Sequence, residues 1–249
     1  MAASAERNRG YSAGEWGARV ELAAAYRLTH HFGMTTLIYN HITARAPDAE
    51  GQFLINEYGL GYDEVSASNL LKIDMDGNVL DEGKHRINYT GFVIHSAVHG
   101  ARDDVSCVMH THTPYGMAVS TLEEGLVPLQ QEAYQFHDRV AYHEFEGVAL
   151  DVEERERLVT DLGDKNAMIL RNHGLLTVGS SVGEAWTRMW MLELACKVQV
   201  LAQSTGQAIR QAPVEAIEKT ASLFDGANAA LEWAWLLRRL DREDPGYKE

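Results

Sequence analysis

Two histidines at the end of an apolar segment are the residues of this chain best suited to chemistry. Residues 105–110 predict a buried strand, and side chains two apart on a strand share a face, so His110 and His112 can reach one point. Pro114 cannot donate to a strand ladder, so we expect the strand to end there with both imidazoles at its mouth. Further along the chain, His173 lies where a second apolar segment breaks before a glycine.

Three imidazoles that converge in this way can hold a metal ion. They suit Zn²⁺, Mn²⁺, Fe²⁺ or Co²⁺ and leave coordination positions open for water or substrate, as a catalytic metal requires. The alternative is three separate histidines that are hydrogen-bonded in the core or in loops, because a His-x-His pair alone often arises by chance. We expect one divalent metal ion per chain, Zn²⁺ first and Mn²⁺, Fe²⁺ or Co²⁺ as other choices, held by His110, His112 and His173.

The elements that must position these histidines alternate between strands and helices. Capping-box spacing at Ser12 and Ser181 predicts helices that run to Gly33 and to about Gln203. Further helices are predicted at 92–101 and 214–240. The β-branched and apolar runs predict strands at 37–46, 52–56, 105–110, 140–145, 167–170 and 175–178, with a hairpin at 72–80 that turns at Asp76-Gly77.

Strands interleaved with helices indicate an α/β sandwich. The length of 249 residues fits one large domain with a sizeable core. We expect a single domain over residues 1–249, with its core at about 12–205 and a C-terminal helical extension at about 213–241.

The composition restricts the class of protein. The chain carries 36 acidic against 22 basic residues, and its net charge of −14 argues against a nucleic-acid partner. No run approaches the roughly 18 apolar residues that a membrane span needs, and the first residues lack the apolar core of a secretory signal. Two cysteines predict no disulfide framework. We expect a cytoplasmic protein that acts on a small molecule, without a membrane or nucleic-acid partner.

The two histidine segments have a wider resemblance. His-Thr-His-Thr-Pro-Tyr at 110–115, followed by Arg-Asn-His-Gly-Leu at 171–175, resembles the class II aldolase/adducin family. Segments 39–45, 53–56 and 91–96 agree, and the likeness covers roughly residues 15–205. The resemblance implies a three-layer α/β/α sandwich with a mostly antiparallel central sheet, homotetramers with active sites between subunits, and His110, His112 and His173 as metal ligands.

The chain departs from the family's sugar-phosphate aldolases at one position that carries chemistry. Those enzymes have a Ser-Ser-Glu run in which the serines help to hold phosphate and the glutamate is the acid/base group. Here the matching residues are Tyr89, Thr90 and Gly91, a run closer to that of the adducin-like branch, which has glycine in the same place. Either the reaction needs no carboxylate there, as in a decarboxylation, or catalysis has been lost.

Other side chains are candidates for proton transfer and for substrate binding. Glu132, Tyr134 and His137 lie close together in the sequence and could replace the carboxylate, although Glu132 could equally be a solvated acid or a salt-bridge partner. Tyr89 could donate a phenolic proton or simply pack in the core. The substrate-binding candidates are Asn40, Asn56, Thr90 and Arg171, of which Arg171 could instead form a structural ion pair.

Two more histidines lie four residues apart on the helix predicted at 92–101. We interpret His95 as a core histidine or one that orients a ligand, and His99 as a residue of the helix surface.

The leading prediction is a metal-dependent lyase. It would cleave a carbon–carbon bond, by decarboxylation or retro-aldol cleavage, in a small hydroxy- or keto-acid without phosphate. One alternative is a non-catalytic adducin-like assembly module with a vestigial metal site. Another is a non-heme iron oxygenase that uses the same three histidines.

Overall fold

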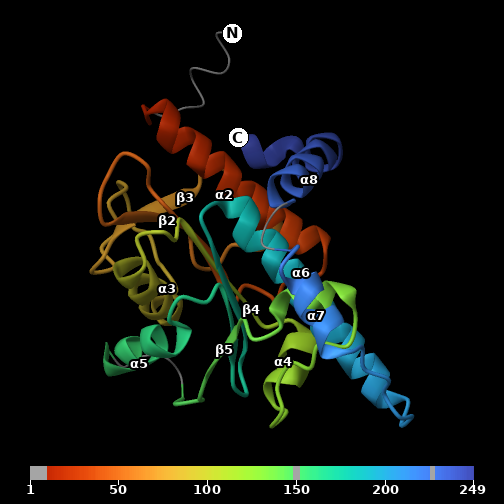
Figure 1. Ribbon diagram of the computed structural model, residues 1–249. Coiled ribbons are helices and arrows are strands. Elements are labelled where there is room, and N and C mark those ends of the chain that lie inside the picture. Colours follow the sequence, from red (N-terminus) through yellow and green to blue (C-terminus); the bar gives the residue numbers. More distant parts are fainter. Residues whose placement is uncertain (1–9, 148–151, 225–227) are drawn as a thin grey trace.

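A mixed sheet forms the centre of the molecule (Figure 1). The computed structural model describes residues 10–147, 152–224 and 228–249. The seven strands have the order β3-β2-β1-β4-β7-β6-β5, and every neighbouring pair is antiparallel except β5 and β6. The strands are β1 (His41–Arg45), β2 (Gln52–Asn56), β3 (Leu70–Asp74), β4 (Cys107–Thr111), β5 (Val140–His143), β6 (Ala167–Leu170) and β7 (Gly174–Gly179).

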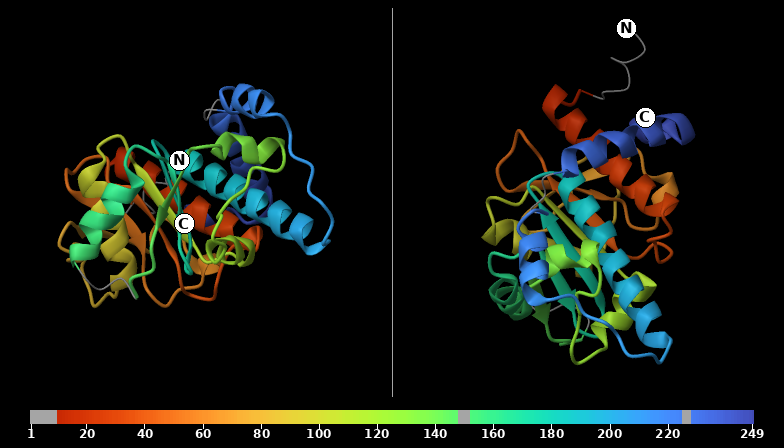
Figure 2. Two further views of the ribbon diagram at one scale, coloured as in Figure 1. Left: turned by 60° about the horizontal axis from the view of Figure 1, so that its bottom comes forward. Right: turned by 45° about the vertical axis from the view of Figure 1, so that its right-hand side comes forward.

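Helices cover both faces of this sheet (Figures 1 and 2). Helices α3 (Tyr89–Ala101) and α5 (Val152–Leu162) lie on one face, whereas α2 (Ala13–His31) and α6 (Val182–Ser204) lie on the other. The shorter helices are α4 (Pro114–Ser120), α7 (Val214–Ala221) and α8 (Ala229–Glu243), with 3₁₀ turns η1 (Tyr62–Glu64), η2 (Gln131–Phe136) and η3 (Pro245–Lys248). The predicted α/β/α sandwich with a mostly antiparallel sheet is confirmed.

The alternation of side chains along β4 divides the core into two parts. Cys107 and Met109 pack in the cluster that includes residues of α2 and α6, whereas Val108 packs with residues of α3 and α5. Because His110 is two residues beyond Val108, its ring points to the α3 side of the sheet.

Several predicted elements are confirmed at their ends. The Ser12 and Ser181 side chains accept hydrogen bonds from the backbone N–H groups of Glu15 and Glu184, so both helices begin where the capping boxes predicted. The strand at 52–56 has the predicted bounds, and the turn near Gly77, whose φ is 84°, returns the chain to an isolated bridge between Ile73 and Val79.

Other expectations were wrong. The strand predicted from residue 37 begins only at His41, because Thr36 and Tyr39 close a tight turn in which Leu37 has a φ of 51°. The single helix predicted at 214–240 is two helices, α7 and α8, with residues 225–227 outside the described part. Helices α4 and α5 were not predicted.

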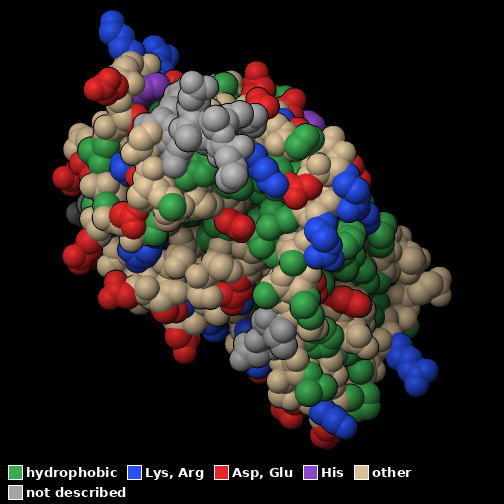
Figure 3. Space-filling model, turned by 90° about the horizontal axis from the view of Figure 1, so that it is seen from above, with side chains coloured by type: hydrophobic (Ala, Val, Ile, Leu, Met, Phe, Trp, Pro, Cys, Tyr) green, Lys and Arg blue, Asp and Glu red, His purple; other side chains and the backbone are tan. Residues whose placement is uncertain are grey.

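The C-terminal helices pack against the rest of the chain. Trp233, Leu236 and Leu240 of α8 are buried against α2 and α6. Within the described residues, no helix has both the length and the apolar character needed to cross a bilayer. Acidic side chains are spread over the face seen in Figure 3, in keeping with the net charge of −14.

Candidate metal centre

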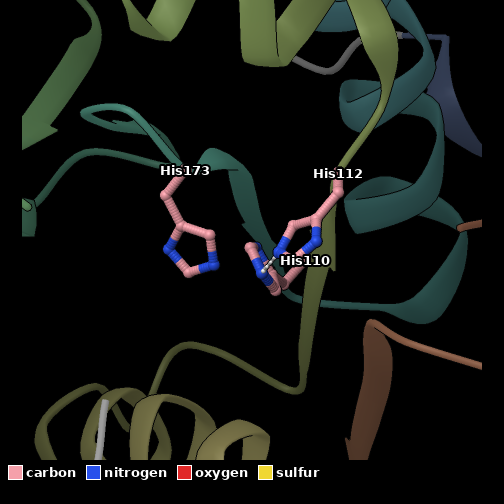
Figure 4. A group of neighbouring side chains, drawn as sticks. All are labelled: His110, His112 and His173. Carbon is pink, nitrogen blue, oxygen red and sulfur yellow. Dashed lines mark hydrogen bonds between the residues drawn. The ribbon is translucent and has the colours of Figure 1, made fainter. Parts of the chain in front are cut away.

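The three predicted histidines meet at one end of the central strands (Figure 4). His110 lies in β4, His112 follows that strand by one residue, and His173 lies in the turn between β6 and β7. The ring centroids are 4.7 Å apart for His110 and His112, 4.8 Å for His110 and His173, and 4.7 Å for His112 and His173. One ligand nitrogen from each ring lies within 4.8 Å of the others, which suits a single ion bonded to all three.

The orientation of His110 is fixed by a backbone group. Its Nδ1 lies 2.9 Å from the carbonyl oxygen of Leu175, so the N–H of Nδ1 donates there and Nε2 keeps its lone pair. That Nε2 is 2.9 Å from Nε2 of His112, which places two potential ligand atoms side by side. The donor set fits a divalent ion that accepts imidazole nitrogen.

Burial keeps these imidazoles neutral, which is the form that binds metal. Desolvation lowers the pKa of His110 well below its ordinary value of 6.5, with the charges of His173 and His112 adding to the effect. Burial also lowers the pKa of His112, and it lowers that of His173 to about 4. At neutral pH the three rings therefore offer lone pairs without first losing a proton.

Two neighbours hold the segment that carries His112. The Thr36 hydroxyl donates to the carbonyl oxygen of His112 at 3.1 Å. When the Asn40 amide is oriented so that both of its atoms have partners, its oxygen accepts from the backbone N–H of His112 at 3.2 Å. The Asn40 amide is thus engaged with two backbone groups. Its predicted role in substrate binding stays a prediction.

A half-buried carboxylate from α6 completes this support. Glu193 accepts hydrogen bonds from the Thr113 hydroxyl at 2.6 Å and from the backbone N–H groups of Gly116 at 2.8 Å and Tyr115 at 3.3 Å. It thereby caps the first turn of α4, directly after His112. Sequence reasoning missed Glu193, since its partners lie far away in the chain and only the packing of α6 on α4 brings them together.

The predicted proton-transfer residues lie elsewhere in the chain. Glu132 and Tyr134 belong to η2, which packs on α6 and α7, and His137 follows it directly. This segment precedes the start of β5, whereas His173 follows the end of β6. Because β5 and β6 are parallel neighbours, the segment and His173 lie at opposite ends of these two strands. No hydrogen bond or ring contact among the described residues joins these three side chains to the metal centre.

The remaining candidates have other partners. Tyr89 is 52% exposed at the start of α3, and the Thr90 side chain lies outside the described part. The Asn56 amide accepts from the Tyr26 hydroxyl at 2.8 Å. Arg171 donates to the carbonyl oxygens of Leu122 and Glu123 and stacks on Tyr142, 4.3 Å from the ring centroid. The positions of Asn56 and Arg171 therefore favour structural roles.

A second group of histidines lies next to the centre, between the sheet and α3. His95 is fully buried, with Nδ1 2.7 Å from the Thr43 hydroxyl. The expectation that His99 lies on the helix surface was wrong. His99 is four residues from His95 and so shares its inward face, where Nε2 lies 2.9 Å from the same hydroxyl and the ring stacks on Phe53.

Comparisons with known proteins agree with this geometry. The profile of the family described as "Class II Aldolase and Adducin N-terminal domain" matches residues 20–200. An aldolase II superfamily protein from Pseudomonas syringae has a similar structure, with a TM-score of 0.92 and 50% identity over 98% of this chain and 99% of that chain. L-fuculose 1-phosphate aldolase from Glaciozyma antarctica PI12 is similar with a TM-score of 0.84 and 29% identity over 99% of both chains.

Similar curated proteins fall into two groups. A Caulobacter vibrioides protein, whose name assigns it only provisionally to aldolase class 2, is 47% identical over 242 residues, 96% of this chain and 94% of its own length. Alpha-adducin from Mus musculus is 46% identical over 193 residues, 76% of this chain but only 26% of its own length. The chain thus spans about a quarter of the adducin that it matches.

Proposed function

The chain belongs to the class II aldolase and adducin family, and on that premise we propose that it is a metal-dependent lyase. It cleaves a carbon–carbon bond, by decarboxylation or retro-aldol cleavage, in a small hydroxy- or keto-acid that carries no phosphate. The observation that supports this most strongly is the convergence of three neutral imidazoles, His110, His112 and His173, on one point.

These residues would hold one divalent ion, Zn²⁺ first, and leave coordination positions for a substrate. Such an ion supplies Lewis-acid chemistry: it draws electron density from a substrate oxygen and stabilises the negative charge that develops as the carbon–carbon bond breaks. Leu175 holds the ring of His110, and Thr36 and Asn40 hold the backbone of His112, which would keep these two residues in position to bind the ion.

The first turn of α3 supports a substrate without phosphate. The residues there are Tyr89, Thr90 and Gly91, which lack both the serine pair and the glutamate of the sugar-phosphate aldolases. L-fuculose 1-phosphate is the substrate in the name of the Glaciozyma relative, but only 29% of the residues are shared with that protein. An organic acid can instead bind the ion through its own carboxylate or keto oxygens.

We propose that the working form is a homotetramer in the cytoplasm, with sites between subunits. Apolar side chains near the centre are exposed in the single chain: Leu37 is 80% exposed, and Phe145, whose ring lies 6.4 Å from that of His173, is 54% exposed. A neighbouring subunit would cover them. In this arrangement, Glu132, Tyr134 or His137 of the neighbouring subunit could transfer the proton at the centre. Tyr89 could do so from the same chain.

The test is metal-restored turnover on a panel of hydroxy- and keto-acids. Protein stripped of metal is assayed with and without Zn²⁺, Mn²⁺ or Fe²⁺, beside His112→Ala and the control His85→Ala, a histidine outside the centre. We expect cleavage in the wild type and in His85→Ala and none in His112→Ala. Full activity in His112→Ala would refute the mechanism, and oxygen uptake that depends on Fe²⁺ would assign the centre to an oxygenase.

The second candidate function is a non-catalytic assembly module of the adducin type. It is favoured by the 46% identity to alpha-adducin and by the glycine at position 91. Metal analysis separates the two functions, because a module needs no ion. Protein that carries less than about one ion per two chains, and gains no thermal stability from Zn²⁺ or Mn²⁺, is a module.

A further inference from the structure

A fourth imidazole, that of His41, lies beside the metal centre. His41 is the first residue of β1 and pairs directly with His110 of β4. Residues opposite each other in a ladder share a face, so both rings project to the α3 side of the sheet. Their centroids are 5.6 Å apart. Neither the sequence motif nor the comparisons assign a role to this ring.

Both ring nitrogens of His41 lack a hydrogen-bond partner, although the residue is only 3% exposed. Buried polar atoms are almost always paired, and an unpaired one costs free energy. The flanking rings are those of His95, 4.3 Å away, and of His110. Nδ1 of His95 is engaged by Thr43, whereas Nε2 of His95 also lacks a partner. Because the other flanking ring, His110, belongs to the centre, a group bound there can supply a partner for His41.

The first turn of α3 lies directly against the His41 ring. A Cβ on Gly91 would lie 2.1 to 2.4 Å from three atoms of the His41 ring, so His41 fills the space that a side chain at position 91 would need. Gly91 belongs to the first turn of α3, whose backbone N–H groups have no acceptor within the helix. That end of the helix favours a negative charge nearby.

His41 is suited to donate a hydrogen bond to such a charge. A neutral imidazole carries one N–H donor and one lone pair. A neutral donor beside a metal site can bind an oxyanion without a change in its own protonation.

We propose that His41 donates a hydrogen bond to an anionic oxygen of the small acid that binds at the metal centre. The choice of an organic acid as ligand rests on the proposed function. His41 is thus a substrate-binding residue, and it selects ligands that carry a carboxylate or enolate oxygen next to the group on the ion.

Oxalate is a suitable probe, because it binds divalent ions and has free carboxylate oxygens. Its affinity for the Zn²⁺-loaded protein is measured by calorimetry for the wild type, His41→Asn and His41→Leu. Asparagine and leucine have nearly the same size, but only asparagine keeps an N–H donor. We expect oxalate binding to weaken about tenfold in His41→Leu and by no more than about threefold in His41→Asn, as for one hydrogen bond to a charged group.

Zn²⁺ affinity, measured on the same variants, is expected to stay within about twofold of the wild type, because His41 is not among the converging ligands. Equal oxalate affinity in the two variants would overturn the proposal. So would a large loss of Zn²⁺ affinity in His41→Leu, since His41 would then be a ligand. If His41→Leu does not fold, weakening of more than about tenfold in His41→Asn also contradicts it. Because oxalate binding needs no turnover, this result is independent of whether the lyase reaction is found.

Discussion

A side chain on Gly174 would lie 2.4 Å from the carbonyl oxygen of Thr111 and 3.1 Å from Cδ2 of His112. Gly174 opens β7, and Thr111 ends β4, so the two strands next to His112 and His173 approach each other where only a hydrogen atom fits. This contact places His173, the residue before Gly174, beside His112. The glycine of the Arg-Asn-His-Gly motif is therefore part of the candidate metal centre.

Gly174→Ala tests this contact. Because the added methyl group meets backbone, the strands must move apart, and we expect a loss of about 1–3 kcal/mol in the free energy of unfolding. We also expect Zn²⁺ affinity to fall at least about tenfold as His173 moves. Gly17→Ala is the control, since nothing lies within 4 Å of a Cβ there and alanine favours a helix. Wild-type Zn²⁺ affinity in Gly174→Ala would contradict the prediction.

Glu193 is predicted to control metal affinity without touching the metal. Glu193→Leu removes the acceptor for Thr113, Tyr115 and Gly116, so the segment after His112 loses its anchor. We expect Zn²⁺ affinity to fall about tenfold or more, with a smaller loss in Glu193→Gln, which keeps one acceptor oxygen.

The matched control for Glu193 is Glu184→Leu. Glu184 belongs to the same helix and also accepts from a backbone N–H, that of Ser180, but at the end of α6 away from α4. Both leucine variants should unfold more easily, yet only Glu193→Leu should lose metal. Equal Zn²⁺ affinities in the two variants would show that Glu193 acts on stability alone.

Arg171 is predicted to hold a loop, not the substrate. Arg171→Met removes the hydrogen bonds to the carbonyl oxygens of Leu122 and Glu123 and the stacking on Tyr142. We expect the free energy of unfolding to fall by about 1–2 kcal/mol and oxalate affinity to stay within about twofold. A tenfold loss of oxalate affinity without loss of stability would restore the role predicted from the sequence.

The buried His99 makes the stability of the metal-free protein depend on pH. Burial, and secondarily the charge of Arg45, lowers the pKa of His99 from 6.5 to about 3. Between these values the unfolded chain binds a proton at this residue and the folded chain does not, so stability falls as the pH drops from 6.5 towards 3. We expect His99→Gln to remove about 1.4 kcal/mol per pH unit from that slope.

Urea unfolding at pH 6.5, 5.5 and 4.5 measures this slope for the wild type and His99→Gln, and points at pH 7.5 and 8.5 extend the series for the control. His85→Gln is the control with the opposite sign. The pKa of His85 is raised by the carbonyl of Glu82 and the carboxylate of Glu57, so its contribution to stability is present below pH 6.5 and is lost as the pH rises through the folded pKa. Parallel slopes in the wild type and His99→Gln would contradict the assignment.

Local patterns in the sequence predicted the three histidines that converge, and most of the elements. Strand alternation brought His110 and His112 to one face, and the serine caps set the starts of α2 and α6. Helix α5 was missed because its sequence is mostly charged and its buried positions, such as Leu158 and Leu162, are few.

The support around the ligands could not be predicted, because it depends on contacts between distant segments. His41 gains its place only when β1 pairs with β4, and Glu193 only when α6 packs on α4. The inward position of His99 required knowledge of which side of α3 faces Thr43. From the sequence alone, polar side chains of this kind could equally lie on the surface.

The most direct test of the central claim is the metal content and coordination of the purified protein. Protein loaded with Co²⁺ or Zn²⁺ is analysed for bound metal and by X-ray absorption spectroscopy, beside His112→Ala. We expect about one ion per chain with imidazole nitrogens as its protein ligands, and a large loss of bound metal in His112→Ala. An ion bound equally well by wild type and His112→Ala, or no ion at all, would contradict a metal centre built from His110, His112 and His173.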